Sequence, residues 1–98
     1  MAITAIISNE TAAVSGAGTE FTTTDRGFWL HSEGFRVFEH CKLLGKGPSG
    51  SYRECTNESA VIQLSAFPNY IFVDLPAGTY RLDKMATENA VYVGWEQA

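Results

Sequence analysis

The stretch 74-DLPAGTYRLDKM-85 decides the fold class, because a tight turn separates two segments of strand character. Pro76 fixes φ at the value that the first turn position needs, and Gly78 can adopt a positive φ. After the turn, Tyr80 and Leu82 alternate with polar residues, which is the period of a strand with one buried face. We therefore interpret this stretch as a rigid β-hairpin.

The same two-residue period recurs in three further segments, 28-FWLH-31, 35-FRVFEHCKLLG-45 and 70-YIFVDLP-76. In the second of these, the strand period places Phe35, Val37, Cys41 and Leu43 on one face. Gly, Pro, Thr, Ser and Asn interrupt the chain at short intervals, and 45-GKGPSG-50 reads as a hairpin loop. The sequence predicts one all-β domain over residues 1–98, an antiparallel β-sandwich of Ig-like or jelly-roll type with about eight strands.

The N-terminal region allows two interpretations. Residues 3-ITAIIS-8 predict a first strand, and residues 11–24 are rich in Thr and Gly. The second segment is either an ordered surface loop or part of an extended arm, within residues 1–24, that docks on a neighbouring chain.

The charge balance disfavours a nucleic-acid partner. The chain has 7 Lys and Arg against 11 Asp and Glu, a net charge of −4, and its basic residues are scattered singly. No apolar run approaches the roughly 20 residues of a membrane span, and the first residues lack the basic start of a signal peptide. We expect synthesis in a cytoplasm, without a nucleic-acid or membrane partner.

Two cysteines, Cys41 and Cys55, lie too far apart in the sequence to form a close zinc-binding pair. We interpret both as small buried apolar residues that could face each other across a hairpin. A disulfide stays open as an alternative, although a reducing cytoplasm disfavours it.

Catalytic candidates are sparse. His31 and His40 are the two histidines, and three carboxylates, Asp25, Asp74 and Asp83, could orient one of them. No nucleophile elbow, zinc-binding H-E-x-x-H or calcium loop occurs, and residues 45–50 lack the phosphate-loop spacing. We therefore predict a protein that is not an enzyme and has no metal or cofactor.

Four aromatic residues do not fit a solvated strand face: Trp29, Phe38, Tyr70 and Phe72. They belong either to a second core face, with the register misjudged, or to an interface, where aromatic side chains are enriched.

A longer pattern joins the opening stretch to the rest of the chain. A hydrophobic first strand and a Gly-Thr-rich link precede Pro76, Gly78, Thr79, Tyr80, Arg81 and Leu82, and then Thr87 and Ala90–Val91. This layout resembles small tailed-phage virion proteins of the head decoration (cement) type. The segment 38-FEHCKLLGKGPSGSYREC-55, with its two cysteines, departs from that pattern.

The resemblance implies a non-enzymatic bacteriophage structural protein that binds and stabilises the head, on the capsid surface. Its partners would be the major capsid protein and sister subunits, as a trimer. A head–tail or tail adaptor is one alternative. A carbohydrate-binding adhesion module is another, in which Trp29, Tyr52, Tyr70 or Trp95 would stack on a sugar ring.

For an assembly role, we predict interface residues in the N-terminal region and among the unexplained aromatic residues. They are Ile3, Ile6, Phe21, Phe38, Tyr70 and Phe72.

Overall fold

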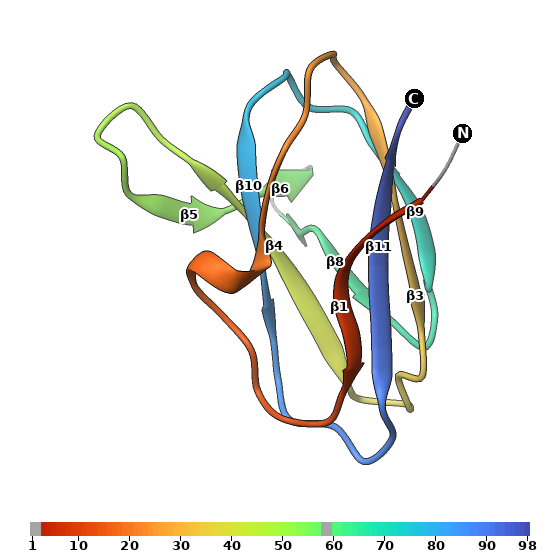
Figure 1. Ribbon diagram of the computed structural model, residues 1–98. Coiled ribbons are helices and arrows are strands. Elements are labelled where there is room, and N and C mark those ends of the chain that lie inside the picture. The colour runs from red at the N-terminus through yellow and green to blue at the C-terminus, as the bar shows by residue number, and fades with distance from the viewer. Residues whose placement is uncertain (1–2, 58–59) are drawn as a thin grey trace.

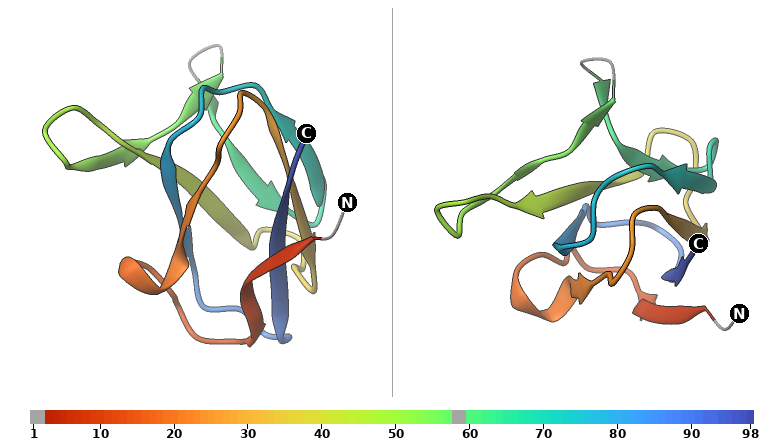
Figure 2. Two further views of the ribbon diagram at one scale, coloured as in Figure 1. Left: turned by 45° about the horizontal axis from the view of Figure 1, so that its top comes forward. Right: turned by 90° about the horizontal axis from the view of Figure 1, so that it is seen from above.

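Two antiparallel sheets face each other across a shared apolar core (Figure 1). The computed structural model describes residues 3–57 and 60–98. The first sheet has the order β1-β11-β3-β9, and the second has the order β2-β10-β4-β5, with β8 also paired to β4. The predicted all-β sandwich is confirmed, and Figure 2 shows its two layers from above.

The described residues contain eleven strands and one short helical turn. The strands are β1 (Thr4–Glu10), β2 (Glu20–Thr22), β3 (Phe28–Glu33), β4 (His40–Lys46), β5 (Tyr52–Glu54), β6 (Thr56–Asn57), β7 (Ala60–Val61), β8 (Gln63–Ser65), β9 (Tyr70–Val73), β10 (Thr79–Lys84) and β11 (Val91–Gln97), and the turn is η1 (Ala17–Thr19). In the described part of the chain, no helix is long and apolar enough to cross a membrane.

The core forms where the inward residues of both sheets meet, as the strand period predicts. Its fully buried side chains include Phe28 and Leu30 from the first sheet and Leu43, Leu64 and Leu82 from the second. At one end, the ring of Phe21 packs between the two layers, with centroid distances of 5.6 Å to Phe28 and 5.3 Å to Trp95. 

The opening stretch 74–85 is not a hairpin, so that prediction is wrong. β9 lies in the first sheet and β10 in the second, and the turn between them crosses from one layer to the other. The Tyr80 hydroxyl donates a hydrogen bond of 2.5 Å to the Pro76 carbonyl and so stabilises the turn between the two sheets. A turn inside one sheet and a turn between two sheets share the same local sequence signals, so the period alone does not distinguish them.

The strand predicted over residues 35–45 begins only at His40. A turn precedes it, in which the Glu39 amide donates to the Arg36 carbonyl and the Glu39 carboxylate accepts from the Arg36 amide. Phe38 has a φ of 75° in this turn and is 92% exposed, and Val37 is also exposed. Cys41 and Leu43 share the buried face of β4 as predicted, and Phe35 packs against the core from the loop before it, whereas Val37 does not.

The predicted hairpin around residues 45–50 is confirmed, since β4 and β5 are antiparallel neighbours. Beyond it, residues 55–57 and 60–62 leave β4 and form the β6–β7 pair, which we call the excursion hairpin. Leu43 of β4 forms a hydrogen bond to each end of the excursion hairpin. The Cys55 amide donates to the Leu43 carbonyl, and the Leu43 amide donates to the Ile62 carbonyl. The described residues contain eleven strands where about eight were expected, and the excursion hairpin accounts for two of the additional ones.

The segment 11–24 packs on its own domain. Val14 bridges to Lys84 through two backbone hydrogen bonds, and the Thr19 hydroxyl donates to the Leu82 carbonyl at 2.7 Å. Lys84 is buried, and its ammonium group donates to the carbonyls of Ala12 and Met85. In this structure the segment is therefore an ordered surface connection rather than a free arm.

Both cysteines are free thiols. Cys41 points into the core opposite Leu64, whereas the Cys55 backbone pairs with Leu43, so the two side chains do not face each other as expected. Burial raises the pKa of the Cys41 thiol to about 12 and also raises the pKa of the Cys55 thiol. Buried thiols with raised pKa values are poorly reactive, which fits the interpretation of both cysteines as apolar packing residues.

Candidate interaction surface

The outer faces of the two sheets differ in chemistry. The outer face of the second sheet is mainly charged, with Glu20, Lys42, Glu54, Arg81 and Asp83. The outer face of the first sheet carries large aromatic side chains instead. Because a solvated sheet face is normally polar, the aromatic side chains on the outer face of the first sheet need an explanation.

We define the aromatic face as Trp29 and His31 from β3, Tyr70 and Phe72 from β9, and Tyr92 from β11. Trp29 lies opposite Phe72 and His31 lies opposite Tyr70 in the β3–β9 register. The Trp29 and Tyr70 rings are stacked with centroids 4.7 Å apart, and Phe72 lies 5.0 Å from Trp29. Tyr70, Phe72 and Tyr92 remain 52%, 47% and 48% exposed, so this cluster stays open to solvent.

A glycine fixes the position of one of these rings. Gly27 has a φ of 89°, and a Cβ built on it would lie 2.8 Å from the ring of Phe72. Only glycine combines this backbone conformation with such close contact. The Phe72 ring therefore packs on the Gly27 backbone and on Trp29.

A polar pair lies within the same face. Nε2 of His31 is 2.9 Å from the Glu96 carboxylate, and both side chains are largely buried. Three aspartates were considered as possible partners of a histidine, but the carboxylate beside His31 is that of Glu96. Glu96 was missed because it lies 65 residues away along the chain, and only the β3–β11 register brings the two together.

His40, Asp74 and Asp83 have other neighbours. The His40 amide points at the Met85 sulfur, at 3.4 Å, and no carboxylate bonds to the His40 ring among the described residues. Asp74 forms an ion pair of 2.8 Å with Arg26. Asp83 lies beside Arg81 on the second sheet.

The six predicted interface residues do not form one surface. Tyr70 and Phe72 belong to the aromatic face, and Ile3 is 53% exposed near Gly94 of β11. Ile6 packs against the core, and Phe21 is buried within it at 7% exposure. Phe21 is thus a core residue, because β2 directs its ring between the two sheets. Its predicted contact with a partner is corrected accordingly.

Phe38 lies apart from the aromatic face, on the loop between β3 and β4. Together with Phe67, on the loop between β8 and β9, it lines a small hollow of about 100 Å³. Phe67 is 88% exposed. Sequence reasoning missed Phe67, because a single aromatic residue in a Pro-containing turn carries no periodic signal.

Within residues 3–57 and 60–98, no group of three or more His, Cys, Asp or Glu side chains could hold a metal ion. No protein-family model, curated protein or solved structure matches this chain.

Proposed function

We propose that this protein is a non-enzymatic structural protein that docks on other protein subunits through the aromatic face. The observation that carries the proposal is the contrast between the two outer surfaces, one charged and one aromatic, on a single small sandwich. The resemblance of residues 76–91 to tailed-phage virion proteins supports a bacteriophage head as the assembly, with the protein as a decoration subunit on its surface.

The geometry of the aromatic face favours docking on protein. Trp and Tyr dominate the energetically important centres of protein interfaces, and pre-ordered rings lose little conformational entropy on binding. Trp29, Tyr70 and Phe72 contact one another, and Gly27 supports the Phe72 ring. Repeated copies on a symmetric shell would add avidity to a modest single contact.

The test compares one substitution on each outer face. Phe72→Asp places a charge in the aromatic face at a half-exposed position, so we expect a folded protein that no longer assembles. Tyr52→Asp is the matched control on the second sheet, where Tyr52 lies under the Arg81 guanidinium. Circular dichroism checks the fold, and cosedimentation with phage heads that lack this protein measures binding.

Loss of binding by Phe72→Asp together with retention by Tyr52→Asp supports the proposal. Equal binding by both variants contradicts it. Light scattering of the free protein separates two versions of the role, since a trimer fits head decoration and a larger ring of fixed copy number fits a head–tail or tail adaptor.

One observation favours a carbohydrate-binding module as a second candidate. The stacked rings of Trp29 and Tyr70 lie beside the His31–Glu96 pair, which combines an aromatic platform with polar groups. Of the other two residues expected to stack on sugar, Trp95 packs on Phe21 in the core and Tyr52 lies on the opposite sheet. A glycan array on which Trp29→Ala abolishes a specific signal would favour this role over assembly.

A further inference from the structure

One edge of the first sheet carries unpaired backbone groups. The Ser32 amide donates to the Asn69 carbonyl at 2.8 Å, which fixes the hydrogen-bonding phase between β3 and β9. Because this phase alternates along an antiparallel pair, Ile71 and Val73 bond to β3, and the amides and carbonyls of Tyr70 and Phe72 point away from it. No strand in the described part of the chain pairs with that outward side of β9.

This edge lacks the features that usually protect an edge strand. Exposed edges are normally interrupted by bulges, prolines or charges. At the other edge of the same sheet, β1 has two register irregularities, and Asn9 within it has a φ of 52°. β9 has the sequence YIFV and a regular register with β3 over all four residues. It can therefore accept another strand without rearrangement.

A groove of mixed polarity runs beside this edge, lined by Asn57, Gln63 and Asp74 as well as by apolar residues. It has a volume of about 480 Å³ and lies between β9 and the excursion hairpin, which projects from the sandwich in Figure 2. Val61 and Ile62 line one side, and Ile71 and Leu75 line the other. The groove thus offers apolar contacts along the same line as the free backbone groups.

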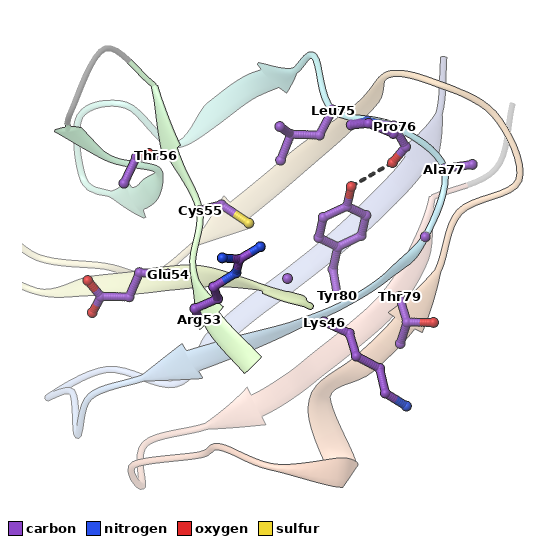
Figure 3. Close-up of a pocket in the computed structure, with 12 residues that line it drawn as sticks. Lys46, Arg53, Glu54, Cys55, Thr56, Leu75, Pro76, Ala77, Thr79 and Tyr80 are labelled. Carbon is purple, nitrogen blue, oxygen red and sulfur yellow. Dashed lines mark hydrogen bonds between the residues drawn. The ribbon is translucent and has the colours of Figure 1, made fainter. Parts of the chain in front are cut away.

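The groove continues into a second hollow with a different charge. Thr56 and Leu75 line both hollows, and the second one, of about 500 Å³, lies between the β4–β5 hairpin and the turn that leads to Tyr80 (Figure 3). Lys46 and Arg53 line it, and neither forms an ion pair within residues 3–57 and 60–98. Lys46 pairs with Tyr52 and Arg53 pairs with Gly45, so the two side chains lie on opposite faces of the hairpin, and Arg53 is the cation on the side of Tyr80 (Figure 3). An unneutralised cation in a chain of net charge −4 favours an anionic group at this end.

We propose that this connected groove binds an extended peptide strand of a partner protein by strand addition to β9. The backbone of the peptide pairs with Tyr70 and Phe72, and its apolar side chains occupy the groove. A carboxylate at one end lies over Arg53. Main-chain pairing supplies affinity in this binding mode, and the apolar and charged hollows supply specificity. The inference does not depend on the particle proposed above.

The test uses blocked synthetic peptides of alternating valine and threonine that end in two aspartates, made in both chain directions. The same peptides ending in two lysines are the charge control. Amide chemical shifts and hydrogen exchange of the ¹⁵N-labelled protein report binding. We expect one aspartate peptide to protect the amides of Tyr70 and Phe72, and its lysine counterpart to bind about tenfold more weakly or less.

Two substitutions at one position isolate the backbone contribution. Phe72→Pro removes the outward amide and leaves the β3 ladder intact, since proline is tolerated on a free strand edge. Phe72→Val removes the ring and keeps the amide. We expect the proline variant to bind the aspartate peptide about tenfold more weakly than the valine variant. If Phe72→Pro does not fold, Tyr70→Pro and Tyr70→Val replace the pair.

Further variants test the charge and separate the two proposals. Arg53→Gln should reduce affinity for the aspartate peptide to that for the lysine peptide. Tyr92→Asp alters the aromatic face outside the groove, so it should abolish docking on heads without changing peptide affinity.

The inference is overturned by unchanged Tyr70 and Phe72 amides at saturating peptide, or by equal binding of the proline and valine variants. It is also overturned if the free protein is a dimer in which these amides are already protected, because a second copy then occupies the edge.

Discussion

Raising the pH above 9 should destabilise the fold through one buried thiol, Cys41. Its side chain is 1% exposed, and burial is the main reason that its pKa rises from the ordinary 9.0 to about 12, with a smaller contribution from the nearby Asp83 carboxylate. A group whose folded pKa is raised stabilises the fold fully below its unfolded pKa. That contribution is lost as the pH rises toward the folded value.

The size of the effect follows from the two pKa values. The folded and unfolded pKa values of Cys41 differ by about three units. Each unit corresponds to about 1.4 kcal/mol, so complete ionisation on unfolding lowers the free energy of unfolding by about 4 kcal/mol. Between pH 9 and about pH 11 the free energy of unfolding should fall by slightly more than about 1 kcal/mol for each pH unit from this group alone. Such a loss is large for a domain of this length.

The assay compares wild type with Cys41→Ala by urea unfolding, followed by tryptophan fluorescence in the presence of a reductant. Other groups also titrate in this range: burial lowers the pKa of Lys84 and raises that of Tyr80. The Tyr80 contribution is common to both proteins and cancels in the difference, whereas Lys84 interacts with the Cys41 thiol, so the difference reports this interacting pair. The alanine variant should start less stable because of its cavity and then lose less stability as the pH rises. Parallel profiles for the two proteins would refute the reasoning.

Two further substitutions test local features of the fold. Gly34→Ala should lower the free energy of unfolding, as measured by thermal unfolding. The loss should exceed the roughly 1–3 kcal/mol that a positive φ costs, because the added Cβ would collide with the Ala90 carbonyl. Gly50→Ala is the control, with a φ of 86° and nothing near its Cβ, and an equal loss in both would contradict the collision. Lys84→Met should cost about 1–3 kcal/mol, since two carbonyls lose their donor, and should speed proteolysis within residues 11–19. Unchanged cleavage in this segment would argue against that anchor.

Local periodicity accounts for the parts of the fold that the sequence analysis predicted correctly. Alternation in 28-FWLH-31 placed Phe28 and Leu30 in the core and the other two side chains on the outside, as observed. The β4–β5 hairpin was also predicted, because its Gly-rich loop is a strong local signal. These features depend only on neighbouring residues.

Features that depend on which strands pair could not be predicted. The residues 74–85 have the same turn chemistry whether the chain returns within one sheet or crosses to the other, and only the pairing of β9 with β3 and of β10 with β4 distinguishes the two. The His31–Glu96 pair and the edge position of β9 likewise follow from strand order. The aromatic residues Trp29, Tyr70 and Phe72 were noticed from the sequence, but their assembly into one face required the β3–β9 register.

The central position of β11 has a consequence for biosynthesis. β11 lies between β1 and β3, so the first sheet has no continuous hydrogen-bonded path until the ribosome has passed Gln97. Before that point, β3 and β9 can pack on the second sheet, whose strands all precede β11, but the first sheet is limited to two strands. The nascent chain therefore emerges with β3 uncovered on its β11 side, and the first sheet is completed after β11 leaves the exit tunnel. Chaperone contact with residues 28–33 during translation is the expected result.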